Sequence, residues 1–193
     1  MCGIIGAASS RNVGKLLIQG LHKMEYRGYD SAGIALHQNH HVTRLRALGK
    51  VQALEDLMIE HKPKSKLGIA HTRWATHGKP SEANAHPHAS SEQIYIVHNG
   101  IIENYKELTK KLKDSGYQFA SQTDSELIAH LIHHHYKNND LLCAMQSATK
   151  ELEGAYAIAA VDLNHKDQLV IARHKSPLLI GVGIEENFAA SDP

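Results

Sequence analysis

Several features that would place this sequence in a specialised class are missing from it. Aromatic residues make up only 5% of the chain, and its two cysteines, Cys2 and Cys143, are too few for a disulfide framework. No apolar run approaches the roughly 18 residues of a membrane-spanning helix, and the first residues lack the basic and apolar stretches of a signal peptide. The 21 Lys and Arg nearly balance the 20 Asp and Glu, which argues against a protein that binds nucleic acid. We therefore expect a reduced, cytoplasmic protein outside the membrane.

The 193 residues that are present have the composition of a globular protein, with 42% hydrophobic and 21% charged residues. No internal repeat and no low-complexity linker divides the chain. Strand-like segments open the sequence, helical patterns fill its middle, and strand-like segments close it. This order favours an α+β layered domain over regular βαβ alternation. We expect one domain over residues 1–193, and because the sequence stops directly after a strand, we expect it to be part of a longer protein.

Hydrophobic periodicity and turn signals predict the individual elements. The predicted strands are 3–8, 34–36, 42–48, 66–72, 94–98, 155–161, 168–172, 178–183 and 188–190. The predicted helices are 12–24, 51–60, 104–115, 125–137 and 141–152. Residues 73–91 are expected to be irregular. The strand over 94–98 is expected to stop at Asn99 and Gly100, a dipeptide that is typical of turns.

Cys2 is the first residue that could carry chemistry. Removal of Met1 would leave it at the N-terminus, with a thiol and a free α-amine on the same residue. The amine has a pKa of about 7.7–8.0 and the thiol one of about 8.5, so the amine can accept the thiol proton near neutral pH. No separate histidine is then needed. The competing interpretation is a buried cysteine near the start of a strand, and position alone favours it.

Seven stretches, taken together, favour the catalytic interpretation. They are CGIIG at Cys2–Gly6, EYRGYDSAG at Glu25–Gly33, HTRWATHG at His71–Gly78, NAHPH at Asn84–His88, HNGIIEN at His98–Asn104, TDSE at Thr123–Glu126 and GAY at Gly154–Tyr156. In this order they resemble the class II glutamine amidotransferases, and most closely the amino-sugar-forming branch of that family. The resemblance covers essentially the whole chain. The opening motif alone would be weak evidence, whereas the ordered set is specific.

The resemblance implies the N-terminal-nucleophile hydrolase fold, a four-layer αββα sandwich, and hydrolysis of the side-chain amide of glutamine. It gives Cys2 the role of nucleophile, while the Asn99 side-chain amide and the Gly100 backbone N–H hold the oxyanion. It implies no cofactor. In the amino-sugar-forming branch a C-terminal sugar-phosphate isomerase domain receives the ammonia, and the full-length chain is expected to be a homo-oligomer. We expect that second half to lie outside this sequence.

The amino-acid head group of glutamine carries one carboxylate and one ammonium, which need partners of opposite charge. A planar guanidinium suits a carboxylate, and the resemblance gives this role to Arg73. It gives the ammonium to Asp124, which lies where a loop enters a helix. Two alternatives stay open at this point, because Arg73 could be a surface residue and Asp124 could be a helix N-cap.

The remaining residues implied by the resemblance belong to loops around the pocket. Trp74, the one tryptophan of the chain, belongs to a loop that closes over bound glutamine, although a lone tryptophan is more often a core residue. Thr76 and His77 are expected to contact the carboxylate end of the substrate. Three supporting residues are expected nearby, namely Arg27, Gly28 and His86.

Sixteen histidines raise the alternative of a metal protein. His130 and His134 have the i,i+4 spacing of a two-ligand site, but a third ligand and an H-E-x-x-H pattern are lacking, so we expect no metal. Two further alternatives are the glutaminase domain of a phosphoribosyl amidotransferase and a non-catalytic domain that keeps the fold. Cys143 lies in an amphipathic pattern and is expected to be a small buried residue.

Overall fold

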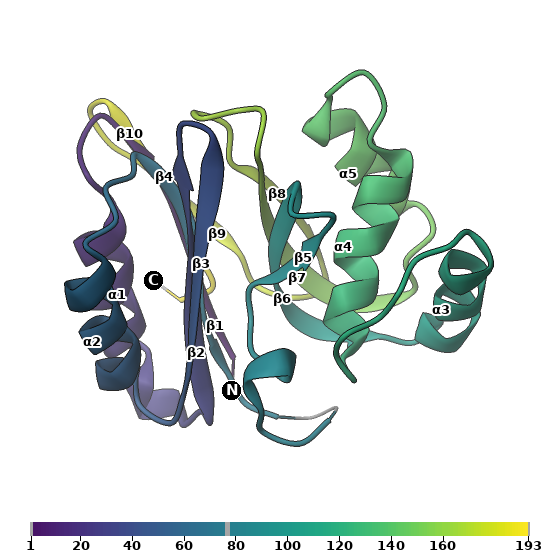
Figure 1. Ribbon diagram of the computed structural model, residues 1–193, viewed down its shortest axis with the longest axis horizontal. Helices are drawn as coiled ribbons and strands as arrows, with labels where there is room; N and C mark the ends of the chain where they lie inside the picture. The colour runs from purple at the N-terminus through teal and green to yellow at the C-terminus, as the bar shows by residue number, and fades with distance from the viewer. Residues whose placement is uncertain (1, 76–77, 193) are drawn as a thin grey trace.

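Two antiparallel sheets packed between helices form the computed structural model, which describes residues 2–75 and 78–192 (Figure 1). The first sheet has the strand order β3-β2-β4-β1-β10-β9 and the second has the order β5-β6-β7-β8. The strands of the first sheet are β1 (Gly3–Ser9), β2 (Ser31–Gln38), β3 (His41–Leu48), β4 (Leu67–Arg73), β9 (Leu179–Val182) and β10 (Glu186–Ala190). Those of the second are β5 (His88–Ser90), β6 (Ile94–Ile102), β7 (Gly154–Asp162) and β8 (Val170–His174).

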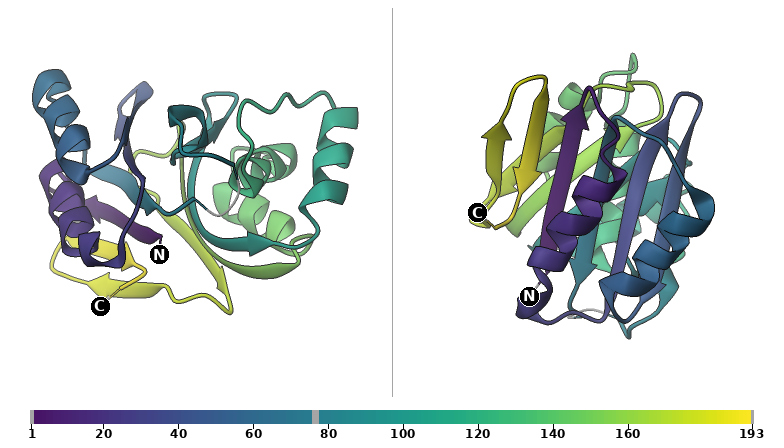
Figure 2. Two further views of the ribbon diagram at one scale, coloured as in Figure 1. Left: turned by 90° about the horizontal axis from the view of Figure 1, so that it is seen from below. Right: turned by 90° about the vertical axis from the view of Figure 1, so that its left-hand side faces the viewer.

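Helices cover the outer face of each sheet, which gives four layers. Figure 2 shows α1 (Gly14–Lys23) and α2 (Val51–His61) lying across the first sheet. On the opposite side of the molecule, α3 (Tyr105–Asp114), α4 (Asp124–His135) and α5 (Leu141–Thr149) lie beside the second sheet (Figure 1). Two short 3-10 turns, η1 (Glu25–Arg27) and η2 (Glu82–Asn84), lie in the connections. The expected α+β class and αββα layering are confirmed. None of the helices in the described ranges combines the length and apolar character that crossing a bilayer requires.

Three apolar layers hold these elements together. Leu17 of α1 packs with β2 and α2 on the outside of the first sheet, and Leu127 of α4 packs with α5 and β6 on the outside of the second. Ile69 of β4 and Val97 of β6 belong to the layer between the sheets. Side chains alternate along a strand, so Ile96 enters the outer layer while Val97 enters the middle one. Over residues 94–98, β6 is therefore buried on both faces.

The expected end of a strand at Asn99 and Gly100 is wrong. β6 continues through both residues to Ile102, because both pair with residues of β7 in an unbroken antiparallel register. Gly100 has a φ of 136°, and a Cβ on it would lie 2.0 Å from the carbonyl oxygen of Ala155. Glycine is thus required here for two paired strands to stay close, and the dipeptide makes no turn.

Two other expectations need correction. Residues 73–91 are not wholly irregular, since they contain η2 and the short strand β5, which is hydrogen-bonded to β6. Three residues are too few for an alternating pattern to predict a strand. Cys143 is exposed, not buried. The inward face of α5 is occupied by other residues, namely Leu141, Ala144, Met145 and Ala148.

The segment around His86 packs directly against the middle of β2. A Cβ on Gly33 would lie 2.0 Å from the backbone oxygen of His86 and 2.9 Å from that of Leu45. Backbone atoms cannot rotate away as the end of a flexible side chain can. Gly33 is therefore the residue that lets this segment approach the first sheet.

We expect Gly33→Ala to lower the free energy of unfolding by about 1–3 kcal/mol, because overpacking against backbone forces strands apart. Gly181→Ala is the matched control. Gly181 also lies in a strand, and its nearest neighbour would be 3.6 Å from the new Cβ, so its effect should stay within about 0.5 kcal/mol. Equilibrium denaturant unfolding of both variants checks this, and equal stabilities would contradict the packing argument.

Candidate active site

Cys2 directly precedes β1 and lies where the two sheets meet. Its side chain lines a small space of about 20 Å³, together with Arg73, Trp74, His86, His98, Gly100, Thr123, Asp124 and Ser125. A neighbouring cavity of about 470 Å³ is lined by Cys2, Arg27, Trp74, Asn99, Gly100, Ile101, Ser176, Pro177 and Ser191. The nucleophile expected from the sequence thus borders both spaces. The structure also brings most of the other expected residues to the same place, from β4, β6, η1 and the start of α4.

The environment of the Cys2 thiol keeps it protonated. Its Sγ accepts a hydrogen bond from the backbone N–H of Trp74 at 3.2 Å and lies 3.6 Å from the Trp74 oxygen. Burial raises the pKa of the Cys2 thiol, and the hydrogen bond with the Trp74 backbone opposes that shift only in part. A protonated thiol is a weak nucleophile. Any reaction at Cys2 near neutral pH therefore needs a base that takes this proton.

Asn99 directs its side-chain amide at Cys2 from the other sheet. Its Nδ2 donates to the backbone oxygen of Cys2 at 3.2 Å, and its Oδ1 lies 3.0 Å from Nε2 of His71. Gly100 follows with the positive φ described above. A side-chain N–H and a glycine backbone thus lie next to each other in the wall of the cavity that Cys2 also lines. Donors arranged in this way can stabilise an oxyanion.

Arg73 is buried, which excludes the surface alternative. The residue is 4% exposed. Its Nη2 donates to the backbone oxygen of Gly78 at 3.2 Å, and its Nη1 lies 3.8 Å from the carboxylate of Asp30. Asp30 in turn accepts a hydrogen bond from the backbone N–H of Ala75. The guanidinium is therefore held at the wall of the small space.

Asp124 is not the N-cap of its helix. Thr123 occupies that position, because its side chain accepts a hydrogen bond from the backbone N–H of Glu126. α4 begins at Asp124, whose Oδ2 accepts from the backbone N–H of Ile102 at 2.9 Å. The carboxylate therefore connects the start of α4 to the end of β6 and lines the small space beside Cys2. This position suits a partner for an ammonium group.

Trp74 is not a core residue, since it is 52% exposed. It borders both spaces at Cys2 and packs against Gly28, on which a Cβ would lie 2.9 Å from the indole ring. Arg27 lines the larger cavity and is paired with Asp192 at 2.6 Å. The expected supporting positions Arg27 and Gly28 thus lie at the site. Thr76 and His77 fall outside the described residues.

A group of buried histidines lies behind the site. The ring of His86 is 4.0 Å from that of His71 and 4.6 Å from that of His88, measured between centroids. His98 lines the small space and hydrogen-bonds to Ser125 at 2.9 Å. Burial lowers the pKa of His71 to about 3 and that of His98 to about 4, and it also lowers those of His86 and His88. These rings are therefore neutral at pH 7.

Of this group, only His86 was expected from the sequence to be a site residue. His71 and His98 each stand first in one of the quoted motifs. Nothing in their residue type or spacing separates them from the other histidines, and only the packing of the two sheets does so. Among the described residues no group of three or more His, Cys, Asp or Glu is arranged to hold a metal ion. His130, from the alternative metal pair, bonds to Ser90.

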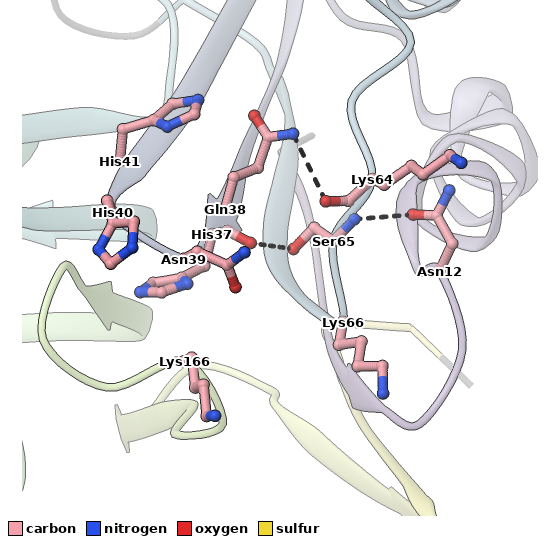
Figure 3. A pocket seen from close by; sticks show the side chains of 10 residues that line it. All are labelled: Asn12, His37, Gln38, Asn39, His40, His41, Lys64, Ser65, Lys66 and Lys166. Carbon is pink, nitrogen blue, oxygen red and sulfur yellow. Dashed lines mark hydrogen bonds between the residues drawn. The ribbon is translucent and has the colours of Figure 1, made fainter.

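A much larger cavity, of about 650 Å³, lies away from Cys2 at the turn between β2 and β3 (Figure 3). It is lined by Asn12, His37, Gln38, Asn39, His40, His41, Lys64, Ser65, Lys66 and Lys166. Its lining lacks cysteine and carboxylate groups, and its three lysines are exposed. The hydroxyl of the buried Ser65 is hydrogen-bonded to backbone oxygens of the protein itself. Size alone therefore does not make this cavity the reaction site.

The αββα sandwich, with a cysteine beside its first strand and amide donors on the facing sheet, defines the class of N-terminal-nucleophile amidotransferases. The family described as "Glutamine amidotransferase domain" matches residues 71–192. The chain is 55% identical to the glutamine–fructose-6-phosphate aminotransferase (isomerizing) of Idiomarina loihiensis and 53% identical to that of Shewanella oneidensis. Each match covers 100% of this chain and 32% of the relative. The chain belongs to the glutamine amidotransferase domain family and spans about a third of the length of these relatives.

Solved structures support the same fold. The glutamine phosphoribosylpyrophosphate amidotransferase from B. subtilis matches with a TM-score of 0.84 at 25% identity, over 98% of this chain and 42% of that chain. A structure described as the allosteric regulatory enzyme of purine biosynthesis matches with a TM-score of 0.86 at 26% identity and the same coverage. A class-II glutamine aminotransferase domain protein from Silicibacter pomeroyi, at 18% identity, shares the fold with a TM-score of 0.71.

The contact between Gly28 and Trp74 can be tested by fluorescence, because Trp74 is the single tryptophan of the chain. We expect Gly28→Ala to push the indole outward and to increase its quenching by acrylamide. Gly116→Ala is the matched control, since Gly116 also has a positive φ but has no atom within 4 Å of a new Cβ. Quenching that rises equally in both variants, or in neither, would contradict the contact.

Proposed function

We propose that this chain hydrolyses the side-chain amide of glutamine to glutamate and ammonia, with Cys2 as the nucleophile. The observation that carries the proposal is the position of Cys2, directly before the first strand of one sheet, against the Asn99 amide of the other sheet, with 3.2 Å between Asn99 Nδ2 and the Cys2 oxygen. Membership of the glutamine amidotransferase domain family supplies the substrate class.

The proposed reaction has two halves. The α-amine of Cys2 takes the thiol proton as the Cys2 Sγ attacks the Cδ carbon of glutamine, and the resulting oxyanion accepts hydrogen bonds from Asn99 Nδ2 and the Gly100 N–H. One such donor lowers the barrier by about 2.7–4 kcal/mol. The C–N bond then breaks as the leaving nitrogen takes a proton from the α-ammonium of Cys2, which releases ammonia and leaves a γ-glutamyl thioester. Water, losing its proton to the same amine, attacks the thioester and yields glutamate and the free thiol.

The α-amine of Cys2 is the proposed base. Burial raises the pKa of the thiol, so the thiolate must be generated by a neighbour within reach. The buried histidines are neutral at pH 7, and the two hydrogen bonds of the thiol both involve the Trp74 backbone. A free amine near its own pKa is a suitable acceptor. The proposal therefore requires that Met1 is removed, since an amide nitrogen cannot act as a base.

The charged residues at the site are the proposed anchors for the head group of glutamine. We assign the carboxylate of the substrate to Arg73, with Thr76 and His77 at the same end, and its ammonium to Asp124. Trp74 would cover the bound substrate and keep water away from the thioester. Three residues have supporting roles at the rim or behind the site, namely Arg27, Gly28 and His86.

The relatives suggest what the ammonia is for. We infer that the chain is the N-terminal part of a cytoplasmic, homo-oligomeric enzyme that converts fructose-6-phosphate to glucosamine-6-phosphate, with ammonia passing to a C-terminal isomerase domain. Identities of 53–55% to the aminotransferases, against 25% to the phosphoribosylpyrophosphate amidotransferase structure, favour this over the phosphoribosyl alternative.

We expect Cys2→Ala to abolish glutamate release from glutamine, because no other group replaces the thiol. The matched control is Cys143→Ala, which removes the other cysteine from an exposed position on α5 and should keep the wild-type rate. An enzyme-coupled glutamate assay on chains freed of Met1 checks both. Equal rates for Cys2→Ala and the unchanged chain would refute the proposed function and favour a non-catalytic domain.

We expect Asn99→Ala to lower kcat by about 10²–10³-fold, the cost of losing one oxyanion donor. KM should change little, because the ground-state amide does not need this donor as strongly as the oxyanion does. Steady-state kinetics with glutamine separates the two constants. A rise in KM with an unchanged kcat would mean that Asn99 binds substrate and does not stabilise the oxyanion.

A further inference from the structure

His71 is a fully buried residue of β4 that reaches from one sheet to the other. In the first sheet it stands opposite Ile4, two residues after Cys2, in the pairing of β4 with β1. Its Nε2 lies 3.1 Å from the backbone oxygen of His98 and 3.0 Å from Oδ1 of Asn99, both in β6 of the second sheet. The imidazole thus links the sheet that carries the nucleophile to the strand that carries the amide donor.

The two contacts fix the position of the hydrogen on His71. A backbone oxygen can only accept a hydrogen bond, so Nε2 must carry the hydrogen. The Asn99 atom that faces Nε2 must then be its oxygen, because an amide NH₂ would oppose a second donor. This places Nδ2 on the other side, where it meets the backbone oxygen of Cys2 at 3.2 Å. A donor at one end, the Nε2–H of His71, and an acceptor at the other, the backbone oxygen of Cys2, therefore select the same orientation of the Asn99 amide.

We propose that His71 is a positioning residue, which holds the Asn99 amide with its N–H toward Cys2 and its oxygen away from it. The proposal rests on the proposed function and adds a residue to it. Rotation of the amide by half a turn would remove the donor and would also turn a carbonyl oxygen toward the negative charge that develops during the reaction. The orientation of one side chain thus decides whether Asn99 stabilises or opposes the oxyanion.

The surroundings of His71 fit this role and leave it no other evident one. The ring is neutral at pH 7, and its Nδ1 has no hydrogen-bond partner within the described part of the chain. Its polar contacts there are therefore confined to β6. On one side it packs against the ring of His86, with 4.0 Å between centroids. The ring is held by packing while its one N–H is directed at Asn99 and the neighbouring backbone oxygen.

Replacing His71 with glutamine or with asparagine separates the effect of side-chain length from the effect of side-chain polarity. The side-chain nitrogen of glutamine is as many bonds from Cα as Nε2 of histidine, whereas that of asparagine is one bond closer to the backbone. We expect His71→Gln to keep kcat within about 10-fold of the unchanged chain and His71→Asn to lose about 10–100-fold in kcat, less than the removal of Asn99 itself. KM should stay within about 3-fold for both, because the amide positions an oxyanion and not the head group.

A double-mutant cycle tests whether His71 acts through Asn99. In the Asn99→Ala background, His71→Asn should cost no more than about 2-fold further, because the residue that it positions is already absent. His130→Asn is the matched control. Like His71, His130 is a buried histidine with a hydrogen bond, but it lies on α4 and its partner is Ser90. Its replacement should leave kcat within about 3-fold.

Each outcome decides the proposal. An equal loss from His71→Asn in both backgrounds, or a His71→Gln variant as slow as His71→Asn, would overturn it and leave His71 a structural residue. If His71→Asn does not unfold cooperatively on heating, that variant is not properly folded, and the kcat of His71→Gln alone tests the proposal. A loss above about 100-fold in the kcat of His71→Gln would then contradict the positioning role. An unchanged rate for Cys2→Ala refutes the proposed function, whereas inactive Cys2→Ala with fully active His71 variants refutes only the role of His71.

Discussion

The packing of the two sheets against each other is the constraint on which the rest of the structure depends. Ile4 and Ile69 from the first sheet meet Val97 and Val161 from the second in a buried apolar layer. Because this layer is closely packed, the facing strands β1 and β6 cannot slide relative to each other without opening cavities. The end of that layer is where Cys2 and Asn99 come together. Two groups 97 residues apart in the sequence are thereby held within hydrogen-bonding distance.

Burial at the same place sets the charge state of the site. It raises the pKa of the Cys2 thiol and lowers the pKa of His71 and His98, so all three groups are neutral at pH 7. Histidines whose pKa is this low can act as donors with a fixed hydrogen but are poor bases, because they bind an added proton weakly. The charge that remains comes from Arg73 and Asp124, which line the same small space. In such a space, with few water molecules, charged groups act on a ligand more strongly than at the surface.

The sequence predicted most helices and strands because these follow from local patterns, whereas the four-layer arrangement was implied by the family resemblance. Helices such as α2 have the periodicity of one buried face. Strands such as β4 have the short apolar pattern of a strand buried on both faces. The predictions failed where a tertiary contact overrides a local signal. Asn99 and Gly100 form a turn signal, yet pairing with β7 carries β6 through them. The helix cap that had stayed open as an alternative for Asp124 is excluded by a local contact, since Thr123 has the capping geometry.

The candidate site divides in the same way. Cys2, Arg73 and Asp124 were found because thiol, guanidinium and carboxylate groups suggest chemistry by themselves, and the family resemblance gave them an order. Their geometry now supports the proposed roles. His71 could not be found, because its importance comes from a contact with Asn99 across two sheets, 28 residues away. A neutral buried imidazole has no signature in the sequence that distinguishes a positioning residue from a packed one.

Mass spectrometry of the chain, freed of Met1 and quenched with acid shortly after mixing with glutamine, tests whether Cys2 forms the covalent intermediate. We predict a γ-glutamyl adduct on the peptide that begins with Cys2, which disappears as glutamate accumulates. Glutamate release without an adduct, or an adduct on Cys143, would contradict it.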